Sequence, residues 1–385
     1  MRDEGDEAQM SQQWVAGFRS GVISPYETHR LFESRGFADQ TVRQPLPLAG
    51  GGERIRVRLT NRFGRNPLRI GAARVALQAK TDAIVPETDR ELRFDGAAEI
   101  TVPPGGEVVS DEVPLAVAAG NLLSLSLYLP DETERATYSH MPMERSYAAP
   151  GNQTAAVELD APETFEIRAY VSGVDVLAPE GTPVAVALGD SWFEGTGTTV
   201  SANHRSVDAL NDRLDRGWVV NLGIAGNRLL TDEHGEHALS RLERDVLTVP
   251  GATHVLVHLG INDLGLPGMY GQPMPTAEEL IAGYTELAVR IHAAGLRALL
   301  ATIGPFAGAI YEGGTSPEAQ EVRAAVNEWI RTSDVFDAVF DSARAVEDPD
   351  APGYIRPDLD SGDGIHLNDE GARLLAGTVD LADLW

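Results

Sequence analysis

The chain has 385 residues, 43% of them hydrophobic and 23% charged, with a formal net charge of −27 and no cysteine. A chain of this length favours two domains, and the composition is that of a globular protein. It contains no run of the roughly 18 apolar residues that a membrane helix needs. The negative charge excludes nucleic acids and anionic membrane surfaces as partners, and the lack of cysteine excludes disulfides and thiolate chemistry.

The first 40 residues form a polar N-terminal segment in which we expect one helix-like stretch. Residues 1–9 are mostly polar and acidic, and they lack the basic and then apolar parts of a secretory signal. We therefore expect a cytoplasmic protein. A chain trimmed of its leader would look the same, so secretion stays open.

Residues 41–177 have the pattern of a β-sandwich. Residues 54–60 alternate apolar and basic side chains, as a strand with one solvated face does. Further short runs, broken by Pro, Gly and Asn, lie at 68–70, 92–94, 107–109, 122–129 and 165–171. This spacing predicts an all-β, jelly-roll-like accessory domain.

A Pro- and Gly-containing connector at 177–183 marks the domain boundary, and residues 178–385 alternate strands with helices. Apolar runs lie at 184–188, 218–222, 253–259, 297–303 and 335–341. Helical patterns lie near 203–215, 237–247, 276–294, 316–332 and 368–382. Five such repeats predict a three-layer α/β/α domain with a parallel five-stranded sheet.

Polar residues follow the ends of these apolar runs. Ser191 comes directly after the first run, in Gly-Asp-Ser, and a hydroxyl at a strand end is a candidate nucleophile. Gly226 follows the second run and Asn262 the third, where a backbone N–H and a side-chain amide can face an oxyanion. Each could instead be an ordinary turn or cap residue.

Asp363 precedes His366 by three residues, just ahead of the last helical pattern. In so short a turn the carboxylate can hold the imidazole Nδ1–H and leave Nε2 free to take a hydroxyl proton. A solvated surface pair is the alternative. The surface pair is the weaker interpretation, because a hydroxyl and two hydrogen-bond donors are expected at the same sheet edge.

No metal or other cofactor is expected. His234 and His237 could suggest a metal site, but they lack the helical H-E-x-x-H spacing, and we expect an exposed loop there. His254 and His258 lie at even spacing within a strand pattern, which favours a structural role.

Four blocks in this order resemble the SGNH (GDSL) hydrolase superfamily: the Gly189–Ser191 block, the block around Gly226, the Gly260–Asp263 block and the Asp363–His366 block. Within that superfamily, residues 223–230, 241–246 and 258–265 resemble a branch of arylesterases and acylhydrolases similar to a xylan-degradation esterase. The resemblance covers about 184–385 and implies a flavodoxin-like hydrolase domain.

The resemblance implies a role for each block. Ser191 would be the nucleophile and, through its N–H, the first oxyanion donor. Gly226 and Asn262 would be the other donors. His366 would be the base and Asp363 the residue that orients it. The sequence departs from the family pattern at Trp192–Glu194, where smaller residues are usual, and at Leu367, where Pro is usual.

Together these features predict a serine esterase that hydrolyses short-chain, acetyl-type carboxylic esters on carbohydrate or aryl alcohols, with Trp192, Phe193 and Asn227 binding the substrate. The same residues could serve an acyltransferase, a thioesterase or a lysophospholipase. A carbohydrate-binding protein with a degenerate hydrolase domain is the non-enzyme alternative. The expected partner is a small-molecule or carbohydrate ester; the oligomeric state cannot be deduced.

Overall fold

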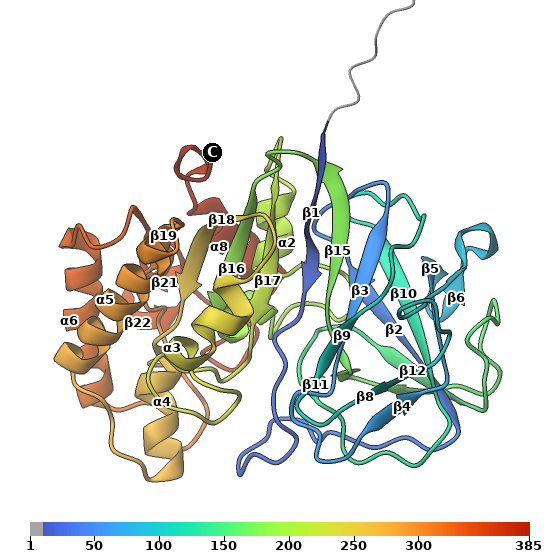
Figure 1. Cartoon of the computed structure of the whole chain (residues 1–385). Coiled ribbons are helices and arrows are strands. Elements are labelled where there is room, and N and C mark those ends of the chain that lie inside the picture. The colour runs from blue at the N-terminus through green and yellow to red at the C-terminus, as the bar shows by residue number, and fades with distance from the viewer. Residues whose placement is uncertain (1–10) are drawn as a thin grey trace, which may run out of the picture.

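The computed structural model describes residues 11–385 and shows two regions side by side (Figure 1). We propose to treat residues 12–179, which are mostly strands, as a β domain, and residues 184–385 as an α/β domain. The segment 1–9, from which a cytoplasmic location is expected, lies outside the described residues. No helix in the described part of the chain combines the length and the apolar character needed to span a membrane.

The β domain contains two main antiparallel sheets. The four-stranded sheet has the order β1 (Gln12–Arg19), β15 (Val171–Pro179), β3 (Ile55–Thr60) and β9 (Glu107–Val109). The seven-stranded sheet contains β13 (Glu163–Phe165), β12 (Ser146–Pro150), β2 (Gln40–Pro47), β10 (Leu122–Leu129), β5 (Ala72–Lys80), β6 (Ala83–Ile84) and β7 (Arg90–Glu91). Two short ribbons pair β4 (Leu68–Ile70) with β8 (Ile100–Val102) and β11 (Tyr138–Ser139) with β14 (Arg168–Ala169).

The alternation expected in the sandwich is present in β3, where Ile55, Val57 and Leu59 are fully buried between outward-facing arginines. The helix expected within residues 1–40 is not found in the described part of that segment. Residues 12–19 form β1 instead, which pairs with β15. Residues 12–19 form a strand because they pair with β15, which lies far away along the chain, and a local sequence pattern does not reveal such a pairing. We therefore include residues 12–40 in the β domain.

The α/β domain has a parallel sheet of the order β17 (Trp218–Gly223), β16 (Val184–Gly189), β18 (Ala252–His258), β19 (Arg297–Ala301) and β20 (Ala338–Phe340). The five expected strands are therefore confirmed. The first strand, β16, lies between the second and the third. In sheets of this type, ligands bind beyond the carboxyl ends of the strands on either side of that point.

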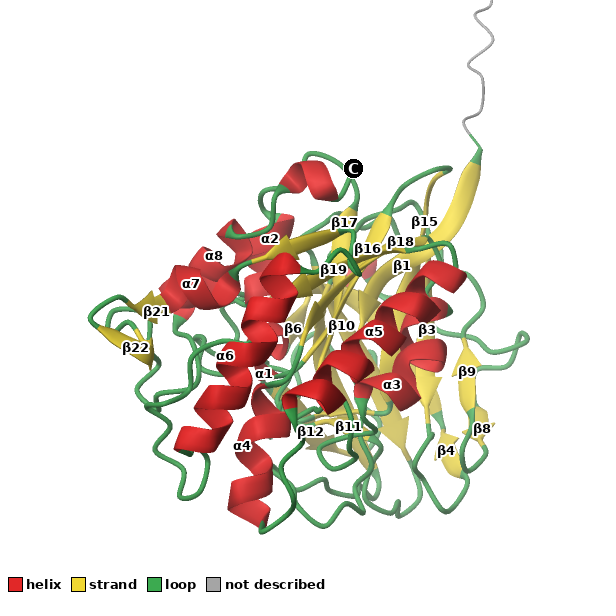
Figure 2. Cartoon of the chain, turned by 90° about the vertical axis from the view of Figure 1, so that its left-hand side faces the viewer, coloured by secondary structure: helices red, strands yellow, loops and turns green. Residues whose placement is uncertain are grey.

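Helices cover both faces of this sheet (Figure 2). One face carries α3 (Ala238–Arg241), α4 (Ile261–Tyr270), α5 (Ala277–Ala293) and α6 (Pro317–Thr332). The other carries α2 (Ser206–Asn211), α7 (Ser342–Val346) and α8 (Asp369–Gly377). The predicted α/β class is confirmed, although α1 (Ser191–Glu194), α4 and α7 were not expected from the sequence.

The remaining elements are short. They are the ribbon of β21 (Glu347–Asp348) and β22 (Ala351–Ile355), the 3-10 helices η1 (Pro86–Thr88) and η3 (Leu381–Asp383), and the π-helix η2 (Leu242–Leu247), which continues α3.

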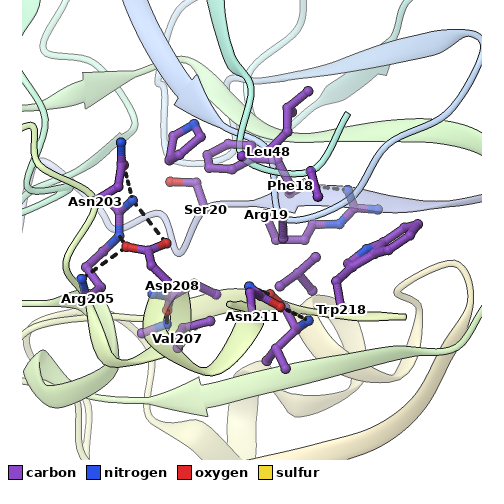
Figure 3. A pocket seen from close by; sticks show the side chains of 18 of the residues that line it. Phe18, Arg19, Ser20, Leu48, Asn203, Arg205, Val207, Asp208, Asn211 and Trp218 are labelled. Atoms are coloured by element: carbon purple, nitrogen blue, oxygen red, sulfur yellow. Dashed lines mark hydrogen bonds and ion pairs between the residues drawn. The ribbon is translucent and has the colours of Figure 1, made fainter. Parts of the chain in front are cut away.

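The two domains share one hydrophobic core, because a single cluster of buried side chains runs from the β-sandwich into the parallel sheet. Trp218 at the start of β17 is central to this contact, and its indole N–H donates to the Ala16 carbonyl of β1 at 2.6 Å. Beside it lies a cavity of about 270 Å³ lined by both domains. Figure 3 shows Phe18 and Leu48 on one side of the cavity and Arg205 and Asp208 on the other.

Replacing Trp218 by Ala should lower the free energy of unfolding by about 3–5 kcal/mol, the usual cost of removing a buried indole. Because the core is continuous, both domains should unfold in one urea transition with a lower midpoint. Trp385→Ala removes a partly exposed indole and is the matched control, with a smaller expected loss. Two separate transitions in the parent protein would contradict a shared core.

Candidate active site

Ser191 is the first residue of α1, a single helical turn at the carboxyl end of β16. The side chain of Asp190 caps this turn by accepting a hydrogen bond from the Trp192 N–H at 3.1 Å. The first N–H groups of a helix have no partner within the helix, so the Ser191 N–H is free to bind another acceptor. Ser191 is only 2% exposed, so little of its surface is accessible to solvent.

His366 lies beside Ser191, with 3.0 Å between its Nε2 and the serine Oγ. Its Nδ1 lies 2.6 Å from Oδ2 of Asp363. An ionised carboxylate only accepts hydrogen bonds, so Nδ1 carries the proton and Nε2 is left to accept one from the serine. The structure thus brings the three residues Ser191, His366 and Asp363 into one chain of hydrogen bonds.

Several donors hold Asp363 in its charged form. Burial works to raise its pKa, but the imidazole and the backbone N–H groups of His366 and Ile365 hold that pKa well below its usual value. The Tyr311 hydroxyl donates a further hydrogen bond at 3.0 Å. Asp363 therefore stays ionised across the range in which an imidazole changes its charge.

The expected donors come from loops that follow neighbouring strands. Ser191 follows β16, Gly226 follows β17 on one side, and Asn262 follows β18 on the other. Within residues 11–385 the Gly226 N–H has no hydrogen-bond acceptor. Asn262 uses one amide hydrogen to bond the Asn227 carbonyl at 3.1 Å, which leaves the other available.

The structure places two of the expected substrate-binding residues in the hydrophobic core. Trp192 and Phe193 are only 3% and 4% exposed. Trp192 donates its indole N–H to the Ile365 carbonyl and stacks on His258, against which Phe193 also packs. Both aromatic rings therefore belong to the core beneath the sheet edge.

Asn227 is also structural. It is completely buried, and its amide donates to the carbonyls of His234 and Glu236 while its own oxygen accepts from Arg241. The loop that contains His234 was expected to be exposed, but His234 is fully buried and lies 2.7 Å from the Tyr270 hydroxyl through its Nε2. Side chains from distant segments cover this loop, and no local pattern reveals them.

Two residues that support the site were not singled out from the sequence. Arg241, which is buried, donates to the carbonyls of Gly189 and Leu222, at the ends of β16 and β17. Glu194 closes α1, and burial raises the pKa of its carboxyl to about 7. A charged residue directly after two aromatic residues was the one signal available for Glu194.

Residues 187–374 match the model of the GDSL-like lipase/acylhydrolase family. No curated protein matches the chain.

Several solved structures match about half of this chain. A GDSL-like lipase from Bacteroides thetaiotaomicron is 15% identical with a TM-score of 0.41, over 52% of this chain and 88% of its own. An acetyl xylan esterase is 20% identical with a TM-score of 0.40, over 51% and 96%. An aryl esterase from M. smegmatis is 17% identical with a TM-score of 0.40, over 50% and 94%.

Asp263, next to Asn262, makes the free energy of unfolding depend on pH. Its buried carboxylate accepts hydrogen bonds from the Leu229 and Leu230 N–H groups, yet burial raises its pKa to about 6. In the unfolded chain that pKa is about 3.9. Its protonation therefore stabilises the fold fully below pH ~4, and this contribution is lost as the pH rises through about 6.

Asp263→Asn stays neutral at every pH. The free energy of unfolding of the parent, minus that of the variant, should fall by about 2–3 kcal/mol between pH 4 and pH 7, as urea titrations at several pH values will measure. Asp95→Asn, on the surface of the β domain, controls for the loss of one negative charge. A difference that stays constant with pH would contradict the assignment.

Proposed function

We propose that Ser191 is the nucleophile of an ester hydrolase, since residues 187–374 match the GDSL-like lipase/acylhydrolase family. The observation that carries this proposal is the chain of hydrogen bonds from Ser191 through His366 to Asp363. An unbroken chain of this kind argues against a degenerate hydrolase domain in a carbohydrate-binding protein.

In the proposed reaction, Ser191 Oγ attacks the ester carbonyl while its proton passes to His366 Nε2. Asp363 stabilises the imidazolium that forms. The Ser191 and Gly226 N–H groups and the Asn262 amide bind the negative carbonyl oxygen. Collapse of this intermediate breaks the bond to the alcohol, which leaves with the proton from His366. Water then releases the acyl group by the same steps, and the residues need no cofactor for this chemistry.

A short acyl group is the second part of the proposal. Trp192 and Phe193 no longer support it, because both rings are in the core. The support is now the small exposed fraction of Ser191, since a narrow approach to Oγ favours a small acyl group.

On the alcohol side we propose an aryl or sugar ring. Tyr311 is 41% exposed and donates to Asp363, next to His366. Tyr354, also exposed, lies against Gly308, which packs on Gly364 beside Asp363. Exposed aromatic faces of this kind bind flat or sugar-like rings.

Ser191→Ala should abolish hydrolysis of p-nitrophenyl acetate, with a loss in kcat of roughly 10⁶-fold, because removing the nucleophile removes most of what the three residues supply together. The fold should survive, as circular dichroism will show. Ser342→Ala is the matched control, since Ser342 is a buried serine whose hydroxyl binds the Thr302 carbonyl. Near-normal turnover by folded Ser191→Ala protein would exclude Ser191 as the nucleophile.

Among p-nitrophenyl acetate, butyrate and octanoate, acetate should have the highest kcat/KM, with octanoate about 10-fold lower or worse because a long chain is forced into a tight opening. Trp192→Phe should lower stability but leave this order unchanged, since the ring does not face the substrate. Octanoate as the best substrate would refute the short-acyl proposal, and a changed order in the variant would return Trp192 to the acyl pocket.

A further inference from the structure

The loop that carries the candidate donor Gly226, residues 224–227, packs directly on the β domain. Ile224 is 1% exposed and belongs to a small hydrophobic cluster whose other buried members all come from the β domain: Ile23, Tyr138 and Ile167. The contact with Gly21 is also tight, because a Cβ on Gly21 would lie 2.4 Å from the Ile224 side chain. The β domain therefore covers one side of this loop.

Glu194 joins three parts of the structure at this point. It ends the same helical turn that Ser191 begins, and one carboxylate oxygen accepts a hydrogen bond from the Ala225 N–H of the loop. The other oxygen accepts from the Ser139 hydroxyl of β11 at 3.1 Å. His140, also from the β domain, is buried with its Nε2 3.8 Å from the carboxylate. Ser139 and Glu194 also line the cavity between the domains.

A second contact, with His234, supports the loop 224–227. His234 fills the space next to Gly226, since a Cβ on Gly226 would lie 2.6 Å from the imidazole. Glu233 and His234 both have positive φ angles, 98° and 53°, which are uncommon for residues other than glycine and must be held by their surroundings. The β domain provides this hold, because both oxygens of Glu27 accept from the Gly235 N–H, at 3.0 and 3.1 Å.

The aromatic rings around His234 complete this contact. Tyr270 binds His234 Nε2 through its hydroxyl, and the His29 ring of the β domain stacks on Tyr270 with 3.9 Å between the ring centroids. The backbone N–H of His29 also donates to Glu233 at 3.1 Å. The segment 27–29 thus holds the strained loop at several points.

We propose that the β domain is part of the catalytic apparatus: through Ser139 and Glu27 it positions the loop 224–227, with Glu194 linking this loop to the turn that carries Ser191. This inference rests on the proposed function, because the loop matters as the carrier of an oxyanion donor. Ser139, Glu27 and Glu194 are positioning residues, since they act through the loop. Donors that stabilise a transition state must be placed within fractions of an ångström, so loosening the loop lowers kcat more than it weakens substrate binding.

Ser139→Ala removes the hydroxyl that holds Glu194, and we expect kcat to fall by about 10-fold while KM changes by less than about twofold. The matched control is Ser110→Ala, because Ser110 is a similarly buried β-domain serine whose hydroxyl binds the Asp111 carbonyl instead, away from the cluster around Ile224. It should lose similar stability and keep the parental kcat. Equal kcat values for the two variants and the parent would overturn the proposal.

Glu27 provides an independent pair of variants. Glu27→Ala should also lower kcat about 10-fold, whereas Glu27→Gln keeps an oxygen that can accept from Gly235 and should restore most of the activity. Similar losses in both variants, or no loss in Glu27→Ala, would contradict the role of this contact. The conservative variant also serves if the alanine variant does not fold.

Amide hydrogen exchange separates a failure of this inference from a failure of the proposed function. A peptide that covers residues 222–228 should exchange faster in Ser139→Ala and in Glu27→Ala than in the parent and in Ser110→Ala. This measurement needs no turnover, so it reports on the loop even if the parent does not hydrolyse the test esters. Unchanged exchange in both variants would overturn the positioning role, whatever Ser191→Ala shows.

Discussion

The order of the parallel strands is the constraint on which the candidate site depends. Because β16 lies between β17 and β18, the loops that follow these three strands meet at one sheet edge, which brings together Ser191, Gly226 and Asn262. The abrupt turn after β16 adds a second consequence. A helix one turn long leaves its first N–H groups unpaired, so one residue can supply both a hydroxyl and a hydrogen-bond donor. Any change that shifted β16 relative to its neighbours would separate all three.

The electrostatics of the site follow from its burial in a strongly acidic protein. Asp190, Glu194 and Asp263 are all buried near the sheet edge, where full ionisation of all three would oppose a developing oxyanion. Burial raises the pKa of Glu194 to about 7 and that of Asp263 to about 6, which reduces this opposition. Asp363 differs because its donors lower its pKa, so the negative charge is kept next to the imidazole that requires it.

The sequence was most informative where a single local signal decided the structure. Apolar runs gave the five parallel strands, and the polar residues after them gave Ser191, Gly226 and Asn262, because the end of a strand fixes where the next residue lies. His366 follows Asp363 by only three residues, so the turn between them is enough to bring the two side chains into contact, and no distant segment is needed. The α/β class and the β-rich N-terminal region followed from the same periodicities.

The sequence could not show the direction in which a side chain points after a turn. Trp192 and Phe193 have the size of pocket residues, but α1 directs both rings into the core. Asn227 is buried, and its amide binds the backbone of the loop that contains His234. Glu194 was missed for a related reason. Its partners Ala225 and Ser139 lie 31 and 55 residues away along the chain, and such distant pairings leave no local pattern. The strand β1 depends in the same way on β15.

The proposed role of Gly226 as an oxyanion donor gives the β domain of this protein a physical purpose. A backbone N–H that is to bind an oxyanion must have no partner in the free protein, so the loop that carries it gives up one of its own stabilising hydrogen bonds. Such a loop has to be held through its other atoms. Here the Ile224 side chain is buried against the β domain, the Ala225 N–H binds Glu194, and His234 packs against Gly226. The Gly226 N–H stays free because its neighbours on both sides are fixed. Residues that precede the parallel sheet reach each of these supports: the β domain packs on Ile224, Ser139 binds Glu194, and Glu27 binds the N–H that follows His234.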